Sequence, residues 1–241
     1  MIREAIDKIL SLASAVVQQV DGRNYVDGPD GFNPIFKPTP TSLVVHTLSA
    51  LVDYLTKEID YLKEAQNDHF IHVVSPTKVL ISAAFNGSGF FERPEFVTAV
   101  FEPPQISTGQ YASLELFIIG LQAFFVQTET SAALLRVVGN LKGEQVQQFA
   151  DDGMTQAVTA KAGLSTVTTV PVPNPVMLKP FRTFPEVDQP ESRFIFRMKQ
   201  QQGDSPSCGL WEADNKLWKV EAIKNIADWL QDKLPNVPII A

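Results

Sequence analysis

Cysteine is almost absent from this chain. Cys208 is the only one among 241 residues, so the chain can form neither an internal disulfide nor a cysteine-based zinc cage. Long hydrophobic runs are missing too. The longest, Leu116 to Val126, is interrupted by Gly120 and Gln122 and is too short to cross a bilayer. The first residues lack a signal-peptide pattern. We therefore expect a cytoplasmic protein that does not insert into membranes.

Signatures of catalysis are also lacking. The sequence contains no G-x-S-x-G motif and no kinase motif set. The glycine-rich run 86–89 lacks the phosphate-loop pattern, so we interpret it as a hairpin loop. His69 and His72 lie three apart next to Asp68, a spacing that on a helix could bind a metal. Here they flank a predicted strand, where residues three apart point to opposite faces, which disfavours a metal site. We expect Cys208 to be a buried thiol. We predict no catalytic residues, no metal and no cofactor.

Two pairs of acids keep alternatives open. Asp151 and Asp152 are adjacent in a predicted turn, where they could hold a divalent ion or make local hydrogen bonds. Glu212 and Asp214 share one face if their strand continues, and a carboxylate pair can perform acid–base chemistry. The other interpretation places Glu212 and Asp214 at a solvated hairpin end.

The charge balance is acidic. The formal net charge is −7 and the pI is about 5.0. Binding to duplex DNA without sequence preference requires many phosphate neutralisations, which this balance disfavours. A local basic pocket is compatible with it.

The stretch Val176–Arg197 is the densest mixture of cations, aromatics and prolines in the chain. Its prolines fix φ and remove backbone donors, which excludes a continuous helix or central strand. Alternation in the strand after Pro190 places Arg193, Ile195 and Arg197 on one face. It places Phe194 and Phe196 on the other face, which we predict enters the core.

Two interpretations of this stretch compete. In the first it binds an anion or a nucleotide, because Arg binds phosphate in a bidentate manner and aromatic rings stack on bases. The ligand-binding residues would then be Lys179, Phe181, Arg182, Phe184, Arg193 and Arg197. In the second, Arg182 and Arg197 pair with nearby acids, namely Glu186, Asp188 or Glu191, and lock the segment to the sheet.

Hydrophobic periodicity predicts the element order. Helices are expected over 2–20 and 41–63, at 113–127 and 128–140, and at 217–234. Strands are expected at 70–74, 78–85, 96–102, 144–150, 154–162 and 166–172, and in a hairpin of 194–199 with 208–213. Because helices and antiparallel strands are segregated in sequence, we predict a single α+β domain over residues 1–241. Its antiparallel or mixed sheet has helices packed on one face.

Three stretches carry a resemblance to a known family. LKPFRTFPEVDQPESRFIFRMK, LWEADNKLWKVEAIKNIADWL and TLSALVDYLTK resemble uncharacterised bacteriophage and prophage proteins of the YfdQ-like family. The resemblance covers about the last third of the chain and one helix. It implies a phage protein acting in the host bacterial cytoplasm, and it supplies no catalytic residues.

Three functions follow as expectations. The first is a non-enzymatic binding protein, in its most specific form an anti-defence sponge that sequesters a nucleotide immune signal. The second is an accessory or interaction protein of phage DNA recombination or assembly, and the third is a nucleotide hydrolase. Apolar segments such as Leu116 to Val126 exceed what one modest sheet covers, so we also expect a homo-oligomer.

Overall fold

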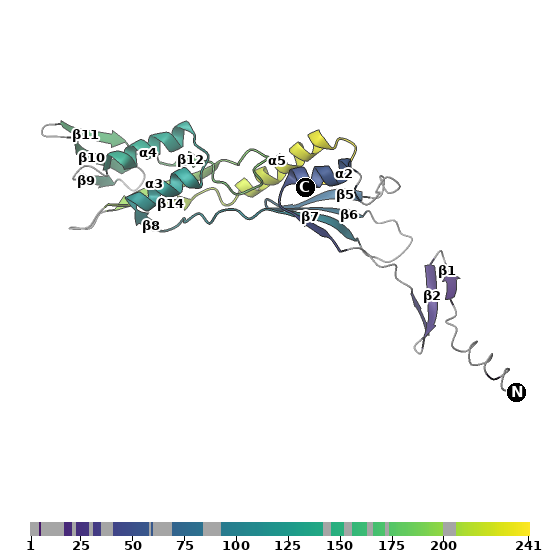
Figure 1. The fold of residues 1–241 in the computed structure, drawn as a ribbon. Helices are drawn as coiled ribbons and strands as arrows, with labels where there is room; N and C mark the ends of the chain where they lie inside the picture. Colours follow the sequence, from purple (N-terminus) through teal and green to yellow (C-terminus); the bar gives the residue numbers. More distant parts are fainter. Residues whose placement is uncertain are drawn as a thin grey trace.

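The protein has an α+β fold, as predicted. The computed structural model describes residues 41–57, 59, 69–83, 93–141, 174–199 and 206–241, together with short pieces at 5, 17–20, 23–28, 31–34, 146–151, 156–162 and 166–171. The described strands form two larger sheets, each with its own pair of helices (Figure 1).

The larger sheet is mixed, with the strand order β15-β5-β6-β7-β4. Its strands are β4 (Leu43–Val45), β5 (His69–Ser75), β6 (Lys78–Ala83), β7 (Glu95–Val100) and β15 (Ile239–Ile240). The helices α2 (Leu48–Thr56) and α5 (Trp218–Lys233) cover one face. Buried Leu48, Leu51, Ile226 and Leu230 from these helices pack on the inward side chains of the strands.

The second sheet is antiparallel, with the order β12-β13-β14-β8. Its strands are β8 (Tyr111–Ser113), β12 (Val176–Leu178), β13 (Ser192–Lys199) and β14 (Ser207–Glu212). The helices α3 (Leu114–Ala123) and α4 (Glu129–Leu141) cover one face. Phe194 and Phe196 enter this core, as their alternation predicted, and the ring of Phe117 in α3 packs 5.5 Å from that of Phe196.

The five-stranded and the four-stranded sheet therefore each have helices on one face, which confirms that part of the prediction. In Figure 1 α2 and α5 lie above the larger sheet, whereas α3 and α4 overlap the strands of the second sheet, and buried residues of these two helices share one core with its strands. No helix among the described residues is long and apolar enough to span a membrane. The single domain over residues 1–241 stays a prediction.

Two three-stranded antiparallel sheets complete the described strands. One consists of β1 (Val17–Val20), β2 (Arg23–Gly28) and β3 (Gly31–Pro34). The other consists of β9 (Val146–Asp151), β10 (Gln156–Ala162) and β11 (Thr166–Pro171). The three strands expected at 144–172 are therefore confirmed.

The helix predicted over 2–20 is wrong at its end. Residues 17–20 form β1, in which Val20 pairs with Arg23. Valine at 17 and 20 suits a strand. Apart from residue 5, which is helical, the rest of the predicted helix lies outside the described residues.

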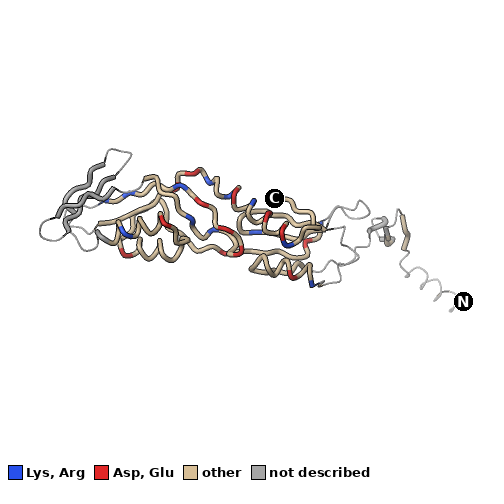
Figure 2. The backbone as a smooth tube through the Cα atoms, turned by 90° about the horizontal axis from the view of Figure 1, so that it is seen from above, with Lys and Arg blue, Asp and Glu red and all other residues tan. Residues whose placement is uncertain are grey.

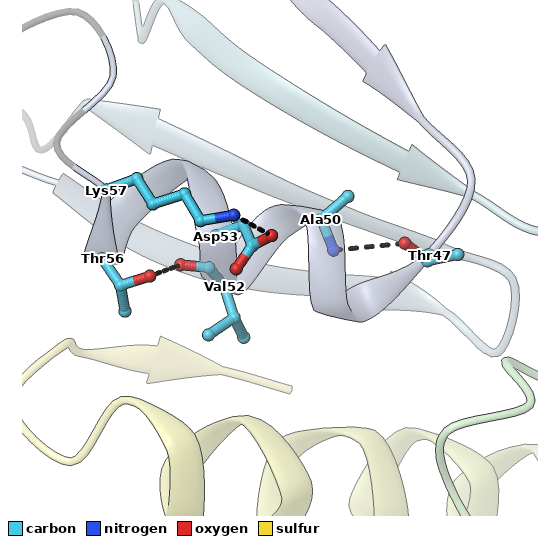
Figure 3. Close-up of polar contacts among 6 residues, drawn as sticks. All are labelled: Thr47, Ala50, Val52, Asp53, Thr56 and Lys57. Carbon is cyan, nitrogen blue, oxygen red and sulfur yellow. Dashed lines mark hydrogen bonds and ion pairs between the residues drawn. The ribbon is translucent and has the colours of Figure 1, made fainter.

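The helix predicted over 41–63 begins later than expected. Residues 43–45 form β4, which pairs in parallel with β7. The helix starts after Thr47, whose Oγ1 accepts a hydrogen bond from the backbone N–H of Ala50 at 3.1 Å (Figure 3). An N-cap hydroxyl of this kind satisfies one of the free donors of the first turn. The β-branched pair Val44-Val45 favours a strand over the predicted earlier start.

Candidate functional site

The basic–aromatic stretch connects the two cores. Val176 and Leu178 of β12 lie in the core of the four-stranded sheet. Phe184 and Val187 lie in the core of the five-stranded sheet, and β13 then returns to the first core. We call residues 179–191, between β12 and β13, the crossing segment. Its path explains why one short stretch needs both apolar anchors and many prolines.

Gln189 holds the crossing segment in shape. Its Oε1 accepts hydrogen bonds from the backbone N–H groups of Arg182 (2.8 Å) and Thr183 (3.2 Å). Its Nε2 donates to the backbone carbonyls of Thr183 (3.2 Å), Phe184 (3.1 Å) and Val187 (3.4 Å). The side chain is buried. Buried backbone groups need hydrogen-bond partners, and the prolines of this segment limit strand pairing. The Gln189 side-chain amide supplies partners in its place.

Arg182 points into the interior. Its side chain is 8% exposed, and its Nη2 lies 2.5 Å from Oε1 of Glu212 at the end of β14. Nη1 donates to the Ser192 hydroxyl at 3.3 Å. The guanidinium carbon lies 4.7 Å from the ring centroid of Trp218 and 5.3 Å from that of Phe194. Burial lowers the pKa of Arg182, and the charges of Glu212 and Asp214 act in the opposite direction.

Arg182 thus forms a structural ion pair, but with a different acid from those expected. Glu186 instead accepts a hydrogen bond from the backbone N–H of Ser49 at 3.1 Å, in the first turn of α2. A carboxylate there also complements the helix dipole. The backbone carbonyl of Asp188 accepts a hydrogen bond from the side chain of Asn225 at 3.0 Å. The crossing segment is therefore fastened to both helices of the larger sheet.

The structure separates the six residues predicted to bind a ligand. Phe184 is fully buried, with its ring 5.8 Å from that of Phe101. Lys179 and Phe181 make backbone hydrogen bonds to Val126 and Phe124, at the end of α3 and just beyond it. With Arg182 in the interior, Arg193 and Arg197 are the two that share one surface.

That surface is the outward face of the four-stranded sheet, which we call the open sheet face. Strand alternation and register assign ten positions to it: Met177 in β12; Arg193, Ile195, Arg197 and Lys199 in β13; Ser207, Gly209 and Trp211 in β14; Tyr111 and Ser113 in β8. Arg193 and Lys199 are exposed, and Tyr111 and Met177 are 38% and 39% exposed. The opposite face of the same strands enters the core beneath α3 and α4.

An aromatic pair lies at the centre of the open sheet face. A Cβ built on Gly209 would meet the benzo edge of Trp211 at 2.7 and 2.8 Å, so the indole lies across this glycine. The rings of Trp211 and Tyr111 meet edge to face, with centroids 5.0 Å apart. The Lys199 ammonium lies 4.4 Å from the Tyr111 ring centroid. Gly209 pairs with Arg197 on one side and with Tyr111 on the other.

The charge of the open sheet face differs from that of the whole chain. Its ten strand positions include three cations and no Asp or Glu, although the net charge of the protein is −7. Elsewhere both signs occur along the described backbone (Figure 2). A surface that combines cations with accessible aromatic rings suits an anionic ligand that carries a flat ring.

The other candidate groups lie in structural settings. Cys208 is buried in the core, and burial raises the pKa of its thiol to about 12. Glu212 pairs with Arg182, and Oδ1 of Asp214 accepts a hydrogen bond from the backbone N–H of Lys216.

His69 is buried while His72 is half-buried on the opposite side of β5, as predicted. Within the described residues no group of three His, Cys, Asp or Glu could hold a metal ion. Loop 86–89, and Asp152 of the acid pair, lie outside the described residues.

Comparison of the chain with family models, with curated proteins and with solved structures gives no match. The resemblance to YfdQ-like phage proteins therefore stays a prediction.

Sequence reasoning missed three residues of the open sheet face: Tyr111, Lys199 and Trp211. Trp211 lies on the outward side of β14. Its alternation with Leu210 and Cys208, both buried, was the available signal that it faces outward. Tyr111 gave no such signal, because β8 has only three residues.

Proposed function

We propose that this protein is a non-enzymatic binding protein that holds an anionic, nucleotide-like ligand on the open sheet face. One observation carries the proposal: Trp211 and Tyr111 lie together on an antiparallel sheet face. The charged residues of that face are Arg193, Arg197 and Lys199. The proposal keeps two arginines from the predicted set and adds the two aromatics and the lysine.

The ligand would use both kinds of group. A base would stack on the exposed side of the Trp211 indole, whose other side lies over Gly209. A phosphate would bind the exposed ammonium of Lys199, with the half-buried Arg197, which is next to Gly209 in the register, contributing positive charge beneath it. No outward strand position carries a carboxylate that would repel the phosphate or act as a base. This arrangement favours binding over turnover.

The biological form of the proposal rests on the resemblance. A phage protein in the host cytoplasm that binds a nucleotide without turning it over would act as a sponge for a nucleotide immune signal. An accessory role in phage DNA recombination or assembly is the second candidate, and the same sheet face would serve it. A nucleotide hydrolase is the third, and the pairing of Glu212 with Arg182 disfavours it.

The first test measures nucleotide binding directly. Titration calorimetry with ATP, GTP and a cyclic dinucleotide at low salt should give binding by the parent protein. Lys199→Glu should weaken that binding at least tenfold, because the Lys199 ammonium lies beside the aromatic pair. Lys224→Glu is the matched control, since it makes the same charge change at an exposed position of α5. Absence of binding to all three nucleotides, or equal effects of the two variants, contradicts the proposal.

The second test separates binding from turnover. The complex is incubated with and without Mg²⁺ and then denatured by heat, and the released nucleotide is analysed by mass spectrometry. An intact nucleotide supports a binding protein. A cleaved nucleotide that accumulates beyond one equivalent supports the hydrolase instead.

A further inference from the structure

We infer that the ligand of the open sheet face is a single-stranded nucleic acid of at least three nucleotides, rather than a mononucleotide. This inference deepens the proposed function and rests on it. It starts from the extent of the face, which provides more groups than one nucleotide can contact.

The cations lie along one strand and span a long distance. Arg193, Arg197 and Lys199 lie on the same side of β13. With a rise of about 3.3 Å per residue, Arg193 lies about 13 Å from Arg197 and about 20 Å from Lys199 along the strand. A nucleotide stacked on Trp211 places its phosphate near Arg197 and Lys199. Arg193 then remains for a second phosphate further along the strand.

The aromatics provide for more than one base. Trp211 lies across Gly209, and Tyr111 follows in the next strand. Sheet faces that bind single-stranded RNA use aromatics on neighbouring strands to stack two or three bases. One face of the Tyr111 ring already has a charged partner, because the Lys199 ammonium lies 4.4 Å from its centroid. A base that stacks there displaces this ammonium, which is then free to bind the adjacent phosphate.

Duplex nucleic acid does not fit this surface. Stacking on Trp211 and Tyr111 requires base faces that are free, and in a duplex they are stacked on each other. Tight duplex binding also relies on many phosphate contacts. The face offers three cations in a chain of net charge −7. Single strands, which combine stacking with a few phosphate contacts, match both features.

The test is a length series. Fluorescence anisotropy of labelled oligouridylates of 2, 4, 8 and 12 nucleotides, with UMP as a competitor, should show affinity rising at least tenfold from 2 to 8 nucleotides. A hybridised 12-base-pair duplex should bind at least tenfold more weakly than the 12-mer. The salt dependence should have a log–log slope of about −2, from three phosphates at about −0.7 each.

Variants test whether oligonucleotide binding takes place on the open sheet face. Arg193→Gln should make the slope less steep by about 0.7. Tyr111→Leu should weaken the 8-mer about five- to hundredfold, the effect of losing one stacked base. Lys224→Gln on α5 should change neither quantity, and circular dichroism checks that each variant folds.

The outcomes distinguish this inference from the proposed function. If UMP or a cyclic dinucleotide binds as tightly as the 8-mer and Lys199→Glu weakens that binding, the proposed function holds and the single-strand inference is wrong. If neither nucleotides nor oligonucleotides bind, both are wrong. If the duplex binds as well as the 12-mer, stacking is not the basis of recognition and the inference is overturned.

Discussion

Arg182 and Glu212 form an ion pair that joins the crossing segment to the end of β14, with the Arg182 Nη2 and Glu212 Oε1 atoms 2.5 Å apart. The two partners differ in exposure, since the arginine side chain is 8% exposed and the glutamate 32%. Glu212 neutralises a cation that is enclosed between Phe194 and Trp218. Because of this difference, we expect removal of Glu212 to destabilise the protein more than removal of Arg182.

The first prediction follows from that inequality. Glu212→Ala leaves a buried guanidinium with Asp214 as the remaining acid that acts on it among the described residues. The variant should lower the free energy of unfolding by about 3 kcal/mol. Arg182→Met keeps much of the packing and leaves a carboxylate that water reaches, so it should cost about 1 kcal/mol. Urea unfolding measures both values.

A ligand-binding role for Arg182 predicts a different result. Oligonucleotide and nucleotide affinity would then fall in Arg182→Met, whereas the structural role predicts unchanged affinity below the unfolding transition. Arg193→Ala is the matched control, because an exposed arginine should change stability by less than about 0.5 kcal/mol while it weakens binding.

The second prediction concerns Gln189. Gln189→Leu has a similar volume but removes five hydrogen bonds to the backbone of the crossing segment. Each buried backbone group left without a partner costs about 1–3 kcal/mol, so the variant should lose at least 3 kcal/mol in urea unfolding. Gln231→Leu is the control, since that exposed side chain makes a single hydrogen bond to Pro235. Equal stability of the two variants would show that Gln189 does not organise the segment.

The parts of the fold that sequence predicted well depend on short-range patterns. The alternation of Arg193, Phe194, Ile195 and Phe196 determines which side of β13 is buried, and the structure agrees. The helical spacing of 217–234 likewise gives α5, whose inward residues Ala222, Ile226 and Leu230 are buried. These patterns work because a period of 2 or 3.6 is a local property of the chain.

The errors arose where long-range pairing decides the structure. Residues 43–45 form a strand because β7 offers a parallel edge, and β7 lies more than fifty residues away. Arg182 was expected to pair with an acid in its own stretch, but the partner Glu212 comes from the neighbouring hairpin. Tyr111 joins the candidate site through the register of β8 with β14. Contacts of this kind depend on topology, which a single sequence does not reveal.

The third prediction concerns the Cys208 thiol. Its pKa is raised to about 12 by burial, so iodoacetamide at pH 8 should leave the native protein unmodified and label it fully in 8 M urea. Between pH 9 and about 12 the unfolded thiol ionises while the folded one stays protonated. The folded state then binds more protons, so the free energy of unfolding falls as the pH rises. Cys208→Ser should remove part of that fall, and rapid native labelling would contradict the assigned burial.

The fourth prediction concerns Gly209 beneath the Trp211 indole. A Cβ at this position would lie 2.6 Å from the Gln110 carbonyl oxygen and 2.7 Å from the indole. Gly209→Ala should therefore move the ring, lower stability by about 1–3 kcal/mol and weaken binding at the open sheet face. Gly139→Ala in α4 is the matched control, since nothing lies within 4 Å of the added atom. That change should stabilise the helix by up to about 1 kcal/mol.

The last prediction concerns assembly, which the apolar character of 116–126 first suggested. In α3, Leu114, Phe117 and Leu121 enter the core, while Leu116 and Ile119 are 64% and 52% exposed. Exposed apolar residues one turn apart on a helix form a stripe that a second copy can cover with its own α3 in a two-fold arrangement. Sedimentation at micromolar concentration should give a dimer or a larger oligomer, and Leu116→Arg should give a monomer. Val220→Arg, at a 69% exposed position in α5, should leave the mass unchanged. A monomeric parent protein, or dissociation by Val220→Arg alone, would refute this interface.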